Sequence, residues 1–160
     1  MNNYAVNHIN LNFFNEIDFS LKSVLKTNSY EEDILFVLRI PRINLVEKVY
    51  TMNSSLNDVD IHVQILEGSI VDKNFIFLAA HSGNGSNSYF NRLIELKQGE
   101  VIYINKSNEE KQFVVESLFY IEKDGYFEYS SLENANILYL ITCSLNDNSK
   151  QLIVKARLLD

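Results

Sequence analysis

Residues 112 to 121 read Gln112-Phe-Val-Val-Glu-Ser-Leu-Phe-Tyr-Ile121, and this stretch decides the fold class. β-branched and aromatic residues dominate it, as they do in β-strands. In an extended chain, successive side chains point to opposite faces, and here each of the two faces would mix apolar with polar residues. The stretch therefore predicts a long, half-exposed strand.

Seven further short apolar runs, also rich in β-branched and aromatic residues, lie on either side of this strand in the sequence. Turn-forming residues separate them at Gly68, at residues 83–85, at Gly99 and at Asp124-Gly125. Residues 89–96 offer one short helical turn between strands. Eight short strands divided by turns predict an all-β fold, either a closed barrel or a sandwich. The seven further runs are residues 34–40, 43–50, 62–66, 75–80, 101–104, 137–142 and 152–158.

The N-terminal part of the chain has a different pattern. After ten Asn-rich residues, which we expect to be frayed, apolar residues recur at steps of three and four, which predicts an amphipathic helix. Such a helix packs on its own domain or, alternatively, on a partner or a membrane surface. We expect a helical segment over residues 1–33 and a β-domain over residues 34–160. The apolar stripe consists of Leu11, Phe14, Ile17, Leu21 and Val24 or Leu25.

Composition excludes several classes of protein. The 160 residues suit one domain with its own core. A net charge of −7, without a basic cluster, argues against nucleic-acid binding. The single cysteine cannot form an internal disulfide. No apolar run approaches the roughly 18 residues that span a bilayer, so we expect membrane association only through an anchor that is not among these residues.

Candidate chemistry centres on the one thiol and on three imidazoles. Cys143 directly follows the apolar run 137–142, and His81 directly follows the apolar run 75–80; each stands before a polar loop. Active-site side chains often lie where a rigid strand ends and a loop begins. We expect His8 to be solvated and His62 to be structural. Spacing alone does not show whether Cys143 and His81 meet, so two unrelated strand ends remain an alternative.

Several segments resemble the sortase family. The residues around His81 are similar to the histidine segment of sortases, and Leu140-Ile-Thr-Cys143 resembles their cysteine signature, with Tyr139 where its first Thr usually stands. Other segments match further strands of the family in order, so the resemblance covers residues 34 to 158. The matching segments are Phe77-Leu-Ala-Ala-His81-Ser-Gly-Asn-Gly, Leu140-Ile-Thr-Cys143, Ile40-Pro-Arg-Ile-Asn-Leu45, Gly99-Glu-Val-Ile-Tyr103 and Leu152-Ile-Val-Lys-Ala156.

This resemblance implies a closed eight-stranded sortase-type β-barrel and a cysteine transpeptidase. Cys143 would attack a Leu-Pro-x-Thr-Gly-like sorting signal of a surface protein, and His81 would exchange the protons. An amine of a peptidoglycan precursor or of a pilin would resolve the thioacyl enzyme at the extracytoplasmic face of the membrane. We expect neither a cofactor nor a metal, because the loop acids lack a calcium-ligand spacing. The residues expected to line the peptide site are Ala80, Ser82, Thr142 and Ser144.

One position departs from the family pattern. Sortases carry an arginine just before the last strand segment, and here that position is Gln151. Gln151 would serve as a neutral oxyanion donor, or Lys150 would swing in as a cation, or activity would be weakened. Arg157 lies six residues along the strand, about 20 Å away. A non-catalytic module that binds sorting signals and a hydrolase that releases the acyl group to water are therefore alternative functions.

Overall fold

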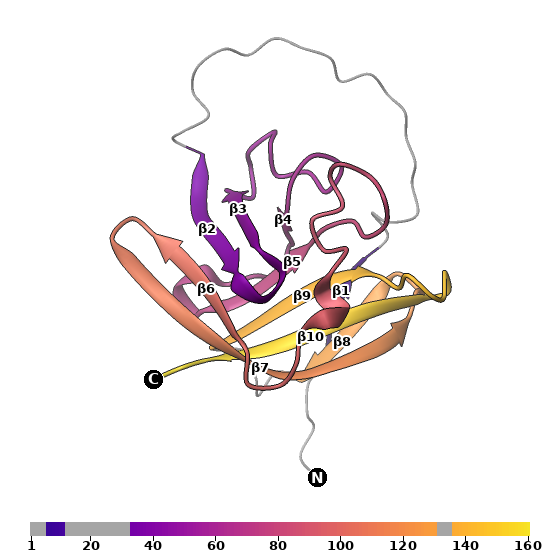
Figure 1. Cartoon of the computed structure of the whole chain (residues 1–160). Helices are drawn as coiled ribbons and strands as arrows, with labels where there is room; N and C mark the ends of the chain where they lie inside the picture. The colour runs from indigo at the N-terminus through magenta and orange to yellow at the C-terminus, as the bar shows by residue number, and fades with distance from the viewer. Residues whose placement is uncertain (1–5, 12–32, 131–135) are drawn as a thin grey trace.

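A computed structural model describes residues 6–11, 33–130 and 136–160. Eight strands form one mixed sheet in the order β3-β2-β6-β7-β10-β9-β5-β4 (Figure 1). A bridge between Val49 and Val63 joins β3 to the residues just before β4, so the sheet nearly closes on itself. The predicted all-β barrel is confirmed. The eight strands are β2 (Ile34–Ile40), β3 (Leu45–Tyr50), β4 (Gln64–Ile65), β5 (Phe75–Ala79), β6 (Val101–Lys106), β7 (Glu109–Glu122), β9 (Ile137–Cys143) and β10 (Lys150–Leu158).

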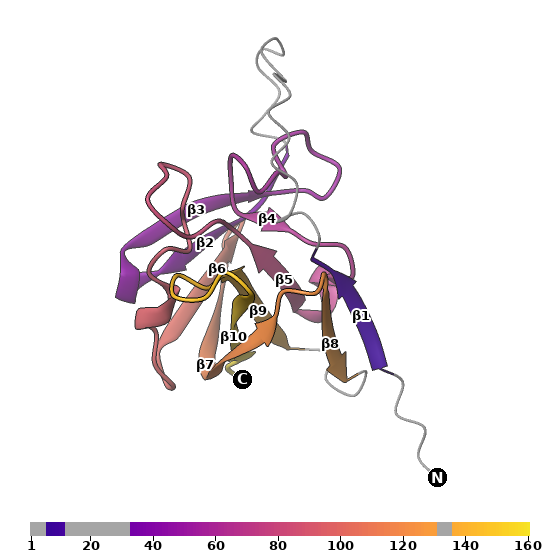
Figure 2. The ribbon, with the colours of Figure 1, turned by 90° about the vertical axis from the view of Figure 1, so that its right-hand side faces the viewer.

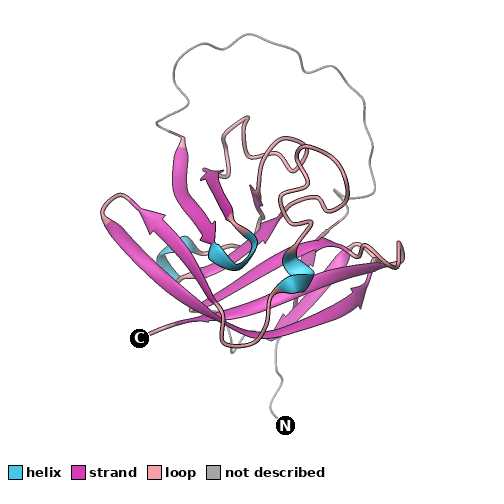
Figure 3. Cartoon of the chain, in the orientation of Figure 1, coloured by secondary structure: helices cyan, strands magenta, loops and turns pink. Residues whose placement is uncertain are grey.

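The helical content of the described residues consists of short 3-10 turns (Figure 3). The turn η4 (Leu93–Glu95) falls in the predicted helical stretch, and η3 (Val71–Lys73) precedes β5. The turn η2 (Pro41–Ile43) shortens the predicted second strand, because Asn44 adopts a left-handed φ of 54° and redirects the chain. Within the described ranges, none of the helices has the length and apolar character required to cross a bilayer.

A second, two-stranded ribbon pairs β1 (Val6–Asn10) with β8 (Tyr126–Ser130) (Figure 2). The expectation of a frayed start is therefore wrong for these residues. Ile9 and Leu11 are buried, and the Leu11 amide donates to the Gly125 carbonyl at 2.6 Å. Apolar burial and cross-strand hydrogen bonds together outweigh the weak local β-propensity of an Asn-rich segment. The predicted helix after Leu11 lies outside the described residues.

The sheet carries an apolar layer on each face. The even-numbered residues Leu138 and Leu140 of β9 point into the barrel, whereas Tyr139 and Ile141 point outward beneath the β1–β8 ribbon. Aromatic rings join the ribbon to the barrel: the Phe127 and Tyr139 ring centroids lie 5.0 Å apart in an edge-on arrangement. The ribbon thus covers part of the outer face of β5, β9 and β10.

A bulge in β7 changes which residues face outward. Val115 pairs with Ala156 and Ser117 pairs with Lys155, so Glu116 is an extra residue in the ladder. The alternation of β7 therefore reverses at this point. Phe113 and Val115 belong to the barrel interior, whereas Phe119 packs on the outer face. The bulge brings the odd-numbered residues at the end of β7 to the outer face of the sheet.

Candidate active site

The ends of two parallel strands bring His81 and Cys143 together. Ala79 of β5 pairs with Ile141 of β9, and the Ala80 amide donates to the Ile141 carbonyl at 3.3 Å. Continued by two residues, this register sets His81 beside Cys143. Residues of equal height on neighbouring strands project to the same face of a sheet. The two strand ends predicted from the sequence are therefore adjacent in the fold.

The hydroxyl groups around this pair hold the two strand ends together. The buried Thr142 hydroxyl donates to the Ala80 carbonyl at 2.8 Å, and the Ser82 hydroxyl donates to the Cys143 carbonyl at 2.8 Å. The Ser144 hydroxyl accepts hydrogen bonds from the amides of Asn146 and Asp147, which shapes the β9–β10 turn. These residues position the site through bonds to the backbone. Ala80 is fully buried and contributes its carbonyl to this arrangement.

The His81 imidazole has a carboxylate partner. Its Nε2 atom lies 2.9 Å from Oδ1 of Asp60, which projects from the loop before β4. The Asp58 carboxylate accepts the Asp60 amide at 2.9 Å, so this turn is hydrogen-bonded internally. The Asn87 amide group donates to the Asp60 carbonyl, and the Tyr89 hydroxyl donates to the Ile61 carbonyl at 3.2 Å. The sequence contains no motif that marks Asp60, because its role depends on the contact between two loops.

The Cys143 thiol is half-buried beside a cavity of about 200 Å³. Burial raises the pKa of Cys143 above its usual value, while the nearby Lys123 ammonium acts in the opposite direction. The resting group is therefore a thiol at neutral pH. The cavity is lined by Ser82, Phe90, Asn91, Ile94, Tyr120, Thr142, Cys143, Ser144, Leu145, Asn146 and Leu152.

Gln151 is the direct cross-strand partner of Cys143. Its side chain is 0% exposed, and within the residues that the structure describes neither amide atom has a hydrogen-bond partner. Buried polar groups are nearly always paired, so an unsatisfied amide next to a thiol indicates a group kept for a ligand or a transition state. Gln151 therefore has the placement, though not the charge, expected of an oxyanion donor.

The other two candidate cations are engaged elsewhere. The Lys150 ammonium lies 3.9 Å from the Asp147 carboxylate in the β9–β10 loop. Arg157 Nε lies 2.6 Å from the Glu116 carboxylate. Arg157 pairs with Ile137, at the opposite end of β9 from Cys143. Neither side chain replaces the arginine that the family pattern leads one to expect at position 151.

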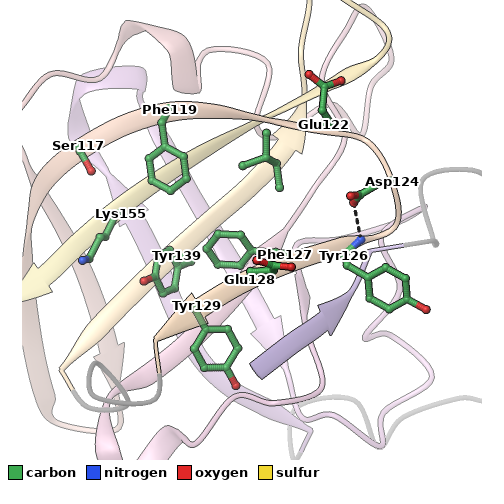
Figure 4. A pocket seen from close by; sticks show the side chains of 11 residues that line it. Ser117, Phe119, Glu122, Asp124, Tyr126, Phe127, Glu128, Tyr129, Tyr139 and Lys155 are labelled. Carbon is green, nitrogen blue, oxygen red and sulfur yellow. Dashed lines mark hydrogen bonds between the residues drawn. The ribbon is translucent and has the colours of Figure 1, made fainter. Parts of the chain in front are cut away.

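A larger groove of about 690 Å³ opens on the outer face, between the end of β7 and β8 (Figure 4). Aromatic rings from β7, β8 and β9 form its walls, with Lys155 at one side and carboxylates at the rim. Ile121 at the β7 wall is the cross-strand partner of Gln151. The β7 wall of the groove therefore lies two strands away from Cys143, with Gln151 of β10 between them. Its lining residues are Ser117, Phe119, Ile121, Glu122, Asp124, Tyr126, Phe127, Glu128, Tyr129, Tyr139 and Lys155.

We expect Asp60→Ala to slow about tenfold the Cys143 acylation that the family resemblance implies, because loss of the carboxylate frees the His81 ring to rotate. Outer partners of functional histidines typically contribute about 10- to 100-fold in metal sites, and the exposure of Asp60 places it at the lower end. Asp60→Asn keeps a hydrogen-bonding oxygen and should retain most of the rate. Stopped-flow or quenched acylation assays measure both variants. Equal losses in both would show that charge, rather than ring orientation, is the contribution of Asp60.

Comparison with known proteins supports the sequence resemblance. The Sortase domain family matches residues 38–159. Sortase A of Bacillus anthracis is 24% identical over 135 residues, which cover 84% of this chain but only 64% of that relative's length. Sortase C of Streptococcus pneumoniae superposes with a TM-score of 0.65 at 19% identity, over 80% of this chain and 70% of the other. Sortase A from Corynebacterium diphtheriae gives a TM-score of 0.65 at 21% identity, over 79% and 61%. With a family match over most of its length and the corresponding barrel, the chain belongs to the sortase family.

Proposed function

We propose that this chain is a cysteine transpeptidase that cleaves a Leu-Pro-x-Thr-Gly-like sorting signal and transfers the protein to an amine of the cell wall. The observation that carries the proposal is the adjacency of His81 and Cys143 at the ends of two paired parallel strands. Family membership supports the same reaction class. The substrate is a surface protein, and the acceptor is a peptidoglycan precursor or a pilin amine, at the extracytoplasmic face of the membrane.

The first half-reaction acylates Cys143. The thiol proton passes to His81, and the Sγ lone pair attacks the carbonyl carbon of the Thr–Gly bond to give a tetrahedral oxyanion. With Nε2 of His81 held by Asp60, Nδ1 carries the proton to the departing glycine amine. The C–N bond breaks, the oxyanion collapses to a thioester, and the glycine fragment leaves as a neutral amine.

The second half-reaction releases the enzyme. An acceptor amine attacks the thioester carbonyl, and His81 takes the proton that this amine loses. The C–S bond breaks, the thiolate regains the proton, and a new amide joins the sorted protein to its acceptor. Gln151 donates a neutral hydrogen bond to the oxyanion in both halves. Ser82, Thr142 and Ser144, which line the Cys143 cavity, help hold the peptide beside the thiol.

Intact-mass measurement after mixing the protein with a pool of Leu-Pro-x-Thr-Gly-like peptides tests this reaction. We expect a mass increase that matches a peptide cut after Thr, absent in Cys143→Ala and strongly reduced in His81→Ala. Addition of an amine such as triglycine should remove the adduct and yield a ligated peptide. If removal requires no amine, the chain is a hydrolase instead.

A non-catalytic module that binds sorting signals is the second candidate. The uncharged Gln151 and the raised pKa of the Cys143 thiol favour it. This alternative predicts peptide binding by calorimetry without any covalent adduct, in the wild type as well as in Cys143→Ala. Covalent mass addition would rule it out.

A further inference from the structure

A row of side chains crosses three strands on the outer face of the sheet, at the level of the thiol. Cys143 on β9 pairs with Gln151 on β10, and Gln151 pairs with Ile121 on β7. Residues directly opposite one another in antiparallel strands point to the same face. The row therefore runs from the nucleophile, across the buried amide, to the end of β7.

Lys123 extends this row toward the thiol. It lies two positions beyond Ile121, so strand alternation returns its side chain to the same face. The Lys123 amide donates to the Ser149 carbonyl at 2.8 Å, which fixes its backbone against the start of β10. The Lys123 ammonium lies near enough to Cys143 to lower the pKa of the thiol, against the larger effect of burial. The register of the sheet thus places a cation, just after the end of β7, on the same face as Cys143.

The other charged groups around the thiol are committed to different partners. His81 and Asp60 hold each other on the β5 side, and Lys150 pairs with Asp147 in the β9–β10 loop. In the β7–β8 turn, the Asp124 carboxylate accepts the Tyr126 amide at 3.0 Å. Glu122 pairs with Lys150 in the strand register and lies on the rim of the outer groove. Lys123, by contrast, is a lysine whose charge acts on the thiol.

We infer that Lys123 is a catalytic residue that supplies, from the position just after β7, the positive charge that Gln151 does not carry on β10. This role rests on the proposed transpeptidase reaction. The ammonium would stabilise the thiolate before attack and the oxyanion after it, since both charges develop within reach of the same side chain. Gln151 and Lys123 then have separate roles, because the amide supplies a neutral hydrogen bond and the ammonium supplies the charge.

The matched variants are Lys123→Met, Lys123→Arg and Lys150→Met. Lys123→Met should move the pH midpoint of Cys143 alkylation by iodoacetamide upward, because removal of a cation disfavours the thiolate. It should also slow peptide acylation by ~10²- to 10³-fold, the usual loss for one oxyanion donor. Lys123→Arg should retain most of the rate. Lys150→Met removes the same charge nearby and should change neither quantity.

A second-site variant tests the separation of roles directly. Gln151→Arg in the Lys123→Met background should recover acylation, because it returns a cation to the same row. Thermal unfolding of every variant checks that the fold is intact. An unchanged alkylation profile in Lys123→Met would overturn the inference, even if the wild type forms the acyl adduct. Alkylation needs no peptide, so it tests the effect of Lys123 on the thiol independently of the proposed reaction. If no peptide acylates the wild type, the proposed function is refuted, and the alkylation profile still decides the role of Lys123 at the thiol.

Discussion

Gln151→Leu is expected to yield a barrel that is more stable but, in the proposed reaction, far slower acylation of Cys143. Gln151 is fully buried, and its amide has no partner within the described residues. A buried unsatisfied polar group costs about 1–3 kcal/mol, which an apolar side chain of similar size recovers. The same change removes a donor beside the nucleophile, for which the expected loss in acylation rate is ~10²- to 10³-fold.

The expected gain in stability and loss in acylation rate have the same cause, because the Gln151 amide would form its hydrogen bond in the transition state and not in the resting protein. In the resting protein the Gln151 amide has no partner among the described residues, whereas an oxyanion beside Cys143 would accept its N–H. Only interactions that are stronger in the transition state than in the ground state accelerate a reaction. Urea unfolding and single-turnover acylation measure the two effects separately. Ile153→Leu, a buried change on the same strand and face, is the control and should leave acylation unchanged. A stability loss in Gln151→Leu would show that the amide has a ground-state partner, which contradicts this account.

Leu11→Ala should lower the free energy of unfolding by about 2–5 kcal/mol, the usual cost of a large-to-small change in a core. Leu11 is 0% exposed and belongs to the apolar cluster that joins the β1–β8 ribbon to Phe77 and Ile141. Because the ribbon covers the outer face of β5 and β9, we expect the loss to appear in cooperative unfolding of the whole barrel. Chemical denaturation followed by circular dichroism provides the measurement.

His8→Ala, in the adjoining strand β1, is the matched control. The His8 side chain is 52% exposed and lies 3.8 Å from Glu128, a surface pair that contributes little. The expected change in stability is within about 0.5 kcal/mol. If Leu11→Ala behaves like His8→Ala, the β1–β8 ribbon does not stabilise the barrel in solution.

The barrel strands were predictable because each carries its own local signal. Ile34–Ile40 was predicted with its observed bounds, and the runs that end at His81 and Cys143 were placed within one residue of their observed ends. Strands buried on both faces, such as β5 and β9, appear in sequence as short continuous apolar runs. His81 and Cys143 stand out for the same reason, since each is a polar residue at the end of such a run.

The features that the sequence did not reveal all depend on contacts between distant segments. β1 pairs with β8, and neither strand has a strong pattern alone, so only their common burial stabilises them. Asp60 and Lys123 lie in polar loops where a charged residue is unremarkable, and the residues near them become evident only in the folded structure. The bulge at Glu116 reverses a regular alternation without any Gly or Pro to mark it.

The parallel pairing of β5 with β9 also has a consequence for folding. Parallel neighbours require a crossover connection, and here Ala80 and Thr142 meet although they are 62 positions apart along the chain. Pairings of such long range form slowly, because the closure of a long loop precedes any stabilising contact. Along the chain, β6, β7 and β8 lie between His81 and Cys143. The two residues therefore come together only when this long intervening segment has closed into a loop. A partly folded chain would accordingly carry Cys143 without His81 beside it, and the proposed transpeptidation would begin only with the completed barrel.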